Sequence, residues 1–183
     1  MMSADAIILK GRLRVFNKKT MEIIAGPWFN TITSGGYDWF LRQSMGAYGT
    51  SRPIVGMRIG NGGADGFGRA LTNDPTLTDV RTPIVSTIED QDYLPITEVI
   101  YDTSPHQVTI NAEFSSSMYA SGDFNSNAVI NEAGLWVRSM ATTPVTPAIM
   151  VSYTVLRNDS GALVEIPVID SLDLLFRWEI RVQ

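Results

Sequence analysis

The sequence contains no cysteine and only one histidine among its 183 residues. The absence of cysteine excludes disulfides, thiolate metal ligands and cysteine nucleophiles. The histidine, His106, follows Ser104-Pro105 at the start of a predicted strand, and no Gly-x-Ser-x-Gly nucleophile elbow occurs in the chain. We interpret His106 as a turn residue, and we expect a protein that is not an enzyme and that needs no metal or cofactor.

The sequence also lacks a long apolar run and an excess of positive charge. No stretch reaches the roughly 18 apolar residues that a membrane-spanning helix needs. The first residues, 1–5, have no basic region ahead of an apolar run, so they do not resemble a secretory signal. The chain has 14 basic and 19 acidic residues and a formal net charge of -5, which argues against a general phosphate-binding surface. We therefore expect neither a nucleic acid nor a membrane as a partner.

What is present is the composition of a folded protein, with 44% hydrophobic and 18% charged residues. The length fits one domain, 1–183. Apolar and polar residues alternate along much of the chain, as in strands with one buried face. The predicted strands are 7–16, 21–24, 54–59, 84–88, 96–101, 108–114, 131–138, 149–156, 163–168 and 174–182. Their spacing of about ten residues favours an all-β fold, an antiparallel β-sandwich with one short helix and long loop arms.

The stretch 131–138 is expected to be the central strand of this sheet. Leu135 and Val137 alternate with Trp136, so the strand is predicted to bury one face. Gly134 removes bulk just before these large residues, which indicates a close backbone approach or a bulge.

The last strand, 174–182, has the clearest alternation in the sequence. Phe176, Trp178 and Ile180 fall on one face, and we expect them to belong to the core. Burying each such side chain contributes about 1.5–3 kcal/mol.

The opening of the chain predicts a hairpin of 7–16 and 21–24. Gly26-Pro27 should end it, because proline cannot donate to a strand ladder. A helix is expected at 37–45, with Ser34 as a cap. Its predicted apolar stripe consists of Tyr37, Phe40 and Leu41.

The glycine-rich stretch 60–68 does not match the known ligand-binding loops. A Walker loop would need Gly-Lys-Ser/Thr after its spacer, and a dinucleotide fingerprint would need a glycine in place of Asp65. Asn61, Asp65 and Asp74 are oxygen donors, but an EF-hand loop would need acidic groups at Gly63 and Thr72. We interpret this stretch as the start of a flexible or partner-ordered loop.

The segment 60–83 is predicted to be an extended assembly arm. More than twenty residues without clear periodicity is long for a connection inside a compact domain. Its apolar residues have neither the period of a strand nor that of a helix, so we expect them to bury against a neighbouring subunit. These residues are Phe67, Leu71, Leu77 and Val80.

Two further groups have a functional alternative. The acidic cluster 89–92 would suit glycoside hydrolysis only with its carboxylates spread across a cleft, and we interpret it as a solvated loop. The tryptophans could form a sugar platform, with Trp136 as the candidate for exposure, but core or subunit contacts are the expected role. They are Trp28, Trp39, Trp136 and Trp178.

The order of several short motifs resembles small virion structural proteins of tailed bacteriophages. In those proteins an Ile-Gly-x-Gly segment, an arm, a Glu-x-Gly-Leu strand and a terminal Trp/Tyr strand recur. This chain departs from the pattern at Ala133, where a larger β-branched residue is expected. The matching stretches are 13–17, 29–30, 57–62, the arm with Leu71 and Leu77, 130–136 and 176–180.

The resemblance implies a non-enzymatic structural subunit of a virion, assembled in the host cytoplasm and placed in the tail or baseplate. Its partners would be other virion proteins and copies of itself, as a homo-oligomer within a ring or shell. Two alternatives stay open, a capsid decoration protein and a carbohydrate-binding β-sandwich for host attachment. The exposure of Trp136 and a glycan array would separate the sugar-binding alternative from the others.

Overall fold

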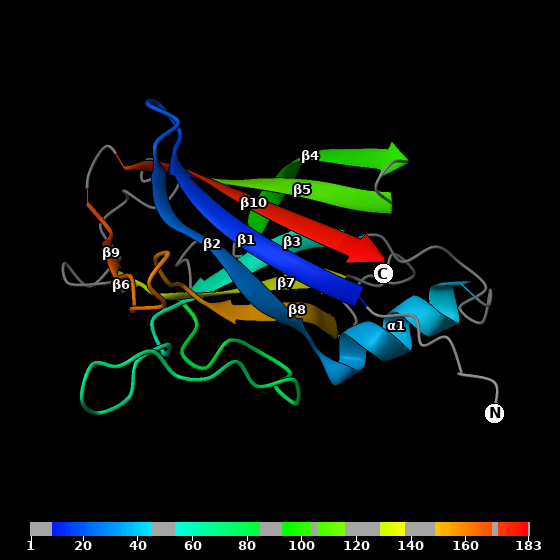
Figure 1. The fold of residues 1–183 in the computed structure, drawn as a ribbon, viewed down its shortest axis with the longest axis horizontal. Helices are drawn as coiled ribbons and strands as arrows, with labels where there is room; N and C mark the ends of the chain where they lie inside the picture. The colour runs from blue at the N-terminus through cyan, green and yellow to red at the C-terminus, as the bar shows by residue number, and fades with distance from the viewer. Residues whose placement is uncertain are drawn as a thin grey trace.

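The main sheet of the protein is antiparallel and closes into a barrel of eight strands, with a short helix at one end (Figure 1). The structure, a computed structural model, describes residues 9–44, 54–84, 93–103, 106–115, 129–137, 149–169 and 172–182. The fold is mostly β, as predicted. The expected open sandwich is wrong, because the sheet closes on itself.

Most barrel strands lie close to their predicted positions. The strands are β1 (Leu9–Asn17), β2 (Ile23–Ile32), β3 (Ile54–Gly60), β4 (Leu94–Thr103), β5 (His106–Ser115), β6 (Val129–Ile130), β7 (Glu132–Val137), β8 (Ile149–Val155), β9 (Ile166–Pro167) and β10 (Asp173–Val182); the helix is α1 (Ser34–Ser44). The order around the barrel is β1-β10-β5-β4-β3-β7-β8-β2, and β6 pairs with β9 in a separate small sheet. The predicted strand 84–88, apart from Ile84, and the acidic cluster 89–92 lie outside the described residues.

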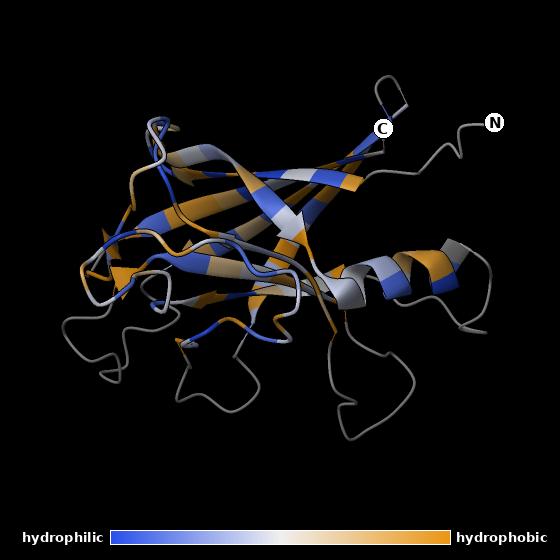
Figure 2. Ribbon diagram, turned by 60° about the horizontal axis from the view of Figure 1, so that its bottom comes forward, coloured by the Kyte–Doolittle hydropathy of each residue, from blue (hydrophilic) through white to orange (hydrophobic). Residues whose placement is uncertain are grey.

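The barrel closes because β10 lies between β1 and β5. Trp178 is paired with Leu13 on one side and with Ile110 on the other, and all three are buried. Directly opposite residues of antiparallel strands share a face, so these side chains form one layer of the interior. The alternation of apolar and polar residues along the strands is visible in Figure 2.

The predicted core strand β10 supplies two fully buried aromatic residues. Phe176 and Trp178 have no exposed surface, and the Trp178 indole N–H donates to Met57 Sδ across the barrel at 3.0 Å. Ile180, nearer the end of the strand, is partly exposed. On the outer face, Glu179 accepts from Arg14 at 2.5 Å.

The first hairpin differs from its prediction at Gly26-Pro27. We expected this dipeptide to end the second arm, but β2 continues through it to Ile32. The pairing with β1 shifts register between Leu13 and Val15, and proline is tolerated at such bulges. Gly26 has φ 84° and donates its N–H to the Arg157 carbonyl at 2.7 Å.

The helix also presents a different face from the predicted one. Thr33, rather than Ser34, is the cap, since its Oγ1 accepts the N–H of Gly36 at 3.0 Å. Any Cβ on Gly36 would overlap the Val151 carbonyl oxygen, so the backbone of the helix approaches β8 closely at this point. This contact turns Trp39 inward and leaves Leu41, in the predicted stripe, 57% exposed.

We predict that Trp178→Ala lowers the free energy of unfolding by about 3–5 kcal/mol, because it leaves a cavity in the barrel interior. Chemical denaturation followed by circular dichroism measures the change. Lys10→Ala, on the exposed outer face of β1, is the control and should change stability by less than about 0.5 kcal/mol. Equal effects of the two substitutions would contradict the assignment of Trp178 to the core.

Candidate functional site

The segment 61–84 lies along the outside of β7 and β8 (Figure 1). Its Val80 belongs to a second apolar cluster, which lies outside the barrel interior. The buried members of this cluster are Val80, Trp136, Met150, Tyr153 and Val155. The segment is therefore packed against its own barrel.

The covering segment explains why β7 is buried on both faces. Leu135 belongs to the barrel interior, whereas Trp136 belongs to the outer cluster and is only 4% exposed. We predicted one buried face for this strand, and that prediction was wrong. Alternation reports the side of a strand on which a residue lies, but it does not report what covers that side.

The carboxylate of Glu132 is the centre of the attachment, and this residue is fully buried. Its Oε1 accepts the backbone N–H groups of Gly62 at 3.0 Å and Thr82 at 2.9 Å. Its Oε2 accepts the N–H of Arg81 at 3.2 Å and the hydroxyl of Tyr153 at 2.7 Å. A buried carboxylate is stable only when it is hydrogen-bonded in this way. One side chain thus ties together the two ends of the segment.

Asn131 adds a second tie at the start of the segment. Its Oδ1 accepts the N–H of Gly63 at 2.8 Å, and its own N–H donates to the carbonyl of Gly60 at 2.9 Å. A Cβ on Gly63 would lie 2.6 Å from the Asn131 carbonyl oxygen, so only glycine allows this approach. We call Asn131 and Glu132 the anchor.

Tyr153 links the anchor to the charged side chains around it. The Arg81 guanidinium donates to the Tyr153 hydroxyl and, at 2.9 Å, to the Thr72 carbonyl. Burial, together with the hydrogen bond and the charge of Glu132, raises the pKa of Tyr153 well above its ordinary value. The hydroxyl therefore keeps its proton and can donate to Glu132.

Two more side chains hold the middle of the segment. Asn73 Oδ1 accepts the N–H of Val155 at 3.0 Å, and Arg157 donates to the Leu71 carbonyl at 2.6 Å. We did not anticipate the roles of Arg81, Tyr153, Asn73 or Arg157. The available signal was Glu132 itself, an acidic residue inside an apolar strand that needs nearby donors.

The four predicted arm residues divide into two groups. Val80 is buried, and Leu71 and Leu77 are partly buried against the outer cluster of the same chain. Phe67, in contrast, is 86% exposed. The apolar surface of Leu71, Leu77 and Val80 is thus covered fully or partly within the same chain, because an irregular segment can pack on its own barrel. Contact between this segment and another subunit stays a prediction, and Phe67 is the most exposed of the four residues.

Phe67 stands on a closed turn, 64–70. Asp65 Oδ1 accepts the N–H groups of Phe67 and Arg69, each at 2.8 Å, and the Asp65 N–H donates to the Arg69 carbonyl at 2.9 Å. Gly68 supplies the positive φ, 73°, that the turn requires. The Arg69 guanidinium lies 5.7 Å from the Phe67 ring centroid. The turn thus holds an exposed aromatic ring on an ordered backbone.

The two aspartates among the candidate calcium ligands have local partners. Asp65 accepts from its own turn, and Asp74 accepts the N–H and the hydroxyl of Thr76 at 2.8 and 2.7 Å. These hydrogen bonds lower the pKa of both carboxyl groups. Within the described ranges, no group of three or more histidine or acidic residues is arranged to hold a metal ion.

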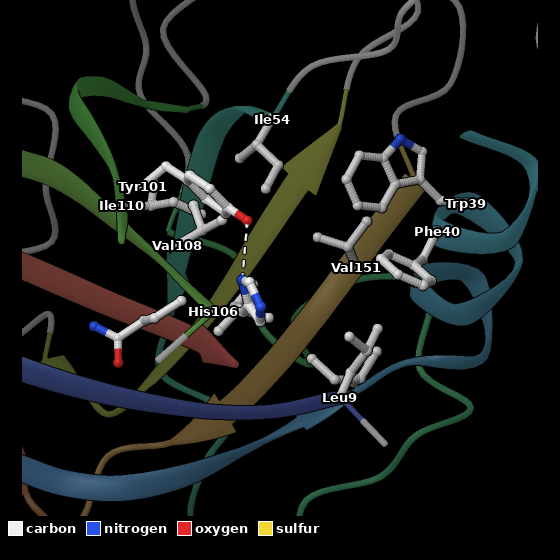
Figure 3. Close-up of a pocket in the computed structure, with 13 residues that line it drawn as sticks. Leu9, Trp39, Phe40, Ile54, Tyr101, His106, Val108, Ile110 and Val151 are labelled. Atoms are coloured by element: carbon white, nitrogen blue, oxygen red, sulfur yellow. Dashed lines mark hydrogen bonds between the residues drawn. The ribbon is translucent and has the colours of Figure 1, made fainter. Parts of the chain in front are cut away.

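The second notable feature is an apolar cavity of about 180 Å³ at the end of the barrel beside α1 (Figure 3). Leu9, Ile54 and Val151 contribute apolar side chains to its lining from three strands, and Trp39 and Phe40 contribute from the helix. The histidine noted in the sequence lies here as well. We call this space the mouth cavity.

His106 is exposed at the rim of the mouth cavity. Its Nδ1 lies 3.4 Å from the Tyr101 hydroxyl, which is the dashed contact in Figure 3. Both residues line the cavity, and they come from the adjacent strands β4 and β5. The contact joins the end of β4 to the start of β5. His106 is the first residue of β5, so it lies at the start of a strand, as the sequence predicted.

Strand β4 borders the mouth cavity. Among the described residues, it pairs with β3 at Pro95 and Leu94. Farther along β4, Val99 is paired with the interior residue Ile110 and so lies on the inward face, yet it is 59% exposed. Tyr101, two residues on, is 62% exposed. In the described residues, the edge of β4 beyond Pro95 has no strand partner on this side.

The tryptophans form no exposed platform. Trp136 and Trp178 are buried, and Trp28 and Trp39 are half-buried. The exposure of Trp136 that the sugar-binding alternative required is absent, because the segment 61–84 covers that ring. The exposed aromatic rings of the described residues are Phe29, Tyr37, Phe67 and Tyr101.

Comparison of the chain with protein-family models, with curated proteins and with solved structures found no match. A search of the described residues for a helix long and apolar enough to cross a membrane also found none.

We predict that Glu132→Ala lowers the free energy of unfolding by about 2–4 kcal/mol, because buried donors lose their acceptor. Hydrogen exchange measured by NMR should show the amides of Gly62, Arg81 and Thr82 exchanging much faster. Glu165→Ala, at an exposed position, is the control and should leave these amides protected. Unchanged protection in Glu132→Ala would contradict the role of the anchor.

We predict that the turn 64–70 loosens in acid. The Asp65 carboxyl has a lowered pKa in the folded protein because it accepts the N–H groups of Arg69 and Phe67. Its contribution is therefore fully present above the ordinary aspartate pKa of about 3.9 and is lost as the pH falls through the lowered value. The amide chemical shifts of Phe67 and Arg69 should follow this titration, and Asp65→Asn should abolish it. A midpoint above the ordinary value would contradict the assignment.

Proposed function

We propose that the chain is a non-enzymatic structural subunit of a tailed-phage virion, located in the tail or baseplate. The observation that carries this proposal is the anchor, which brings together two of the stretches on which the resemblance depends. Gly60 and Glu132 are paired across β3 and β7, and Glu132 accepts from Gly62. The Ile-Gly-x-Gly stretch and the Glu-x-Gly-Leu strand thus have one shared physical role, which is to fasten the segment between them.

The fastened segment supports a role in assembly. A long irregular segment is costly to order, and here it is held by buried hydrogen bonds and an apolar cluster. The result is a fixed outer surface that carries Phe67 in an exposed position. An aromatic residue that is exposed on an ordered surface is suited to contact another protein, because aromatic residues are enriched among those that dominate interface energies.

Neither alternative has a comparable observation in its favour. A capsid decoration protein could use the same anchored segment, so only the place of the protein in a particle separates it from a tail subunit. The carbohydrate-binding alternative depended on Trp136, and that ring is buried.

Immunogold electron microscopy on particles of the encoding phage tests the proposal. Antibodies raised against the recombinant protein should label the tail or baseplate at a fixed position, and mass spectrometry should find the chain in purified particles. Labelling over the head would instead support the decoration protein. Particles that lack the chain altogether would contradict the proposed function.

A further inference from the structure

We propose that the outer face of β1 and β10 binds an acidic segment of another protein, with one carboxylate of that segment seated between Lys10, Arg12 and Arg181. The inference goes beyond the proposed function, because it names the chemistry of a partner. It is drawn from a surface that shares no residue with the anchor or the turn 64–70. It depends on the charges of the two strands and on a small hollow between their side chains.

The outer face of β1 and β10, which lie side by side in Figure 1, has a local excess of positive charge. Five cationic side chains and one carboxylate alternate with the inward-facing residues along 10–14 and 177–181. The chain as a whole has a net charge of -5, so this face is opposite in sign to the rest and attracts an anionic partner. The cations are Lys10, Arg12, Arg14, Arg177 and Arg181, and the carboxylate is that of Glu179.

Two of the cross-strand pairs on this face join like charges. Lys10 is directly opposite Arg181, and Arg14 is directly opposite Arg177. Like charges at directly opposite positions destabilise a sheet, whereas opposite charges stabilise it. The face therefore keeps its positive charge at a cost in stability, as is expected where binding rather than folding determines the residues.

The carboxylate of this face neutralises Arg14 and leaves Arg12 without an ion pair. Glu179 is directly opposite Arg12, yet its Oε1 accepts from Arg14 at 2.5 Å. The Arg12 guanidinium lies instead over the Phe29 ring, 5.1 Å from the ring centroid. Arg12 thus presents its charge beside an aromatic ring that is 56% exposed.

Lys10 and Arg181 complete the set of cations that have no acidic partner. Lys10 is exposed, and Arg181 donates to the neutral side chain of Gln107. Among the residues that the structure describes, no ion pair includes Lys10, Arg12 or Arg181. Their charges are therefore available to an acidic group from outside the chain.

The same three cations line a small hollow, which we call the basic hollow. Its volume is about 30 Å³, which holds one or two groups of the size of a water molecule. The two oxygens of a carboxylate fit this space, and arginine binds both of them through its fork of N–H donors. The lining consists of Lys10, Arg12, Phe29, Glu179 and Arg181.

The composition of the basic hollow favours an acidic polypeptide over a single-stranded nucleic acid. A nucleic acid strand stacks successive bases on several aromatic side chains, whereas the lining has one, Phe29, and Arg12 lies over its ring. The affinity for a nucleic acid also grows with the number of phosphates that the protein neutralises, and three free cations neutralise few. A peptide needs one carboxylate for the hollow and an apolar group for the exposed part of Phe29.

Fluorescence anisotropy with a labelled deca-glutamate peptide tests the proposal on the full chain. The wild-type protein should bind the peptide at low salt and release it at about 1 M salt, because exposed charges are screened. Lys10→Glu and Arg12→Glu, each alone, should weaken binding about tenfold or more. Arg69→Glu, on the turn 64–70, changes the net charge equally and is the matched control, with an affinity within about twofold of wild type. Equal weakening by Arg69→Glu, or no binding at about 1 mM protein, would overturn the proposal.

Thermal melting of the same variants separates a loss of binding from a loss of the fold. Lys10→Glu places a carboxylate opposite Arg181 and should keep or raise the melting temperature, although it weakens binding. A merely structural role of this face would not give that combination. A Lys10→Glu variant that melts like the wild type and binds the peptide with wild-type affinity would overturn the proposal, whatever the fate of Arg12→Glu.

A labelled deca-thymidylate of similar charge tests the other class of partner. It should bind more weakly than deca-glutamate, because the basic hollow has one aromatic side chain and few free cations. Tighter binding of the oligonucleotide would overturn the acidic polypeptide as the partner.

The outcomes separate this contact from the proposed function. A chain that is found in phage tails but fails to bind the peptide would overturn the acidic partner and leave the function standing. A chain that binds the peptide in this way but is absent from particles would overturn the function and leave the contact standing.

Discussion

The buried carboxylate of Glu132 and the segment around it depend on each other. A charge without exposed surface needs hydrogen-bond donors, and three of its four donors are backbone N–H groups of Gly62, Arg81 and Thr82. The segment in turn has no strand ladder to hold it in the middle. Each part is therefore stable only when the other is in place, and the outer surface forms together with the barrel.

This dependence gives the protein two apolar clusters that share one strand. Leu135 packs inside the barrel, and Trp136 packs under the segment. On β8, Tyr153 connects the outer cluster with the anchor, since its ring belongs to that cluster and its hydroxyl donates to Glu132. A change on either side of β7 should therefore affect the other, because the strand cannot shift without disturbing both clusters.

The sequence predicted the strands and the buried face of β10 because period-two alternation depends on local residues. Closure of the barrel could not be predicted, since the pairing of Trp178 with Leu13 joins residues far apart in the chain. The inward face of the helix was missed because it is set by the close approach of Gly36 to β8. In the segment 61–84, Phe67 and Val80 are both apolar residues without a periodic pattern around them. Only the three-dimensional structure shows that Phe67 is exposed and Val80 is buried.

The position of β10 also affects how the chain folds as it is made. Strands β1 and β5 cannot be joined until β10 is available, and β10 follows the other barrel strands in the chain. Until then the nascent chain has two unpaired edges and an interior without Phe176 and Trp178. Such long-range pairing slows folding, so the period before β10 pairs is when the chain is most exposed to aggregation and most dependent on chaperones.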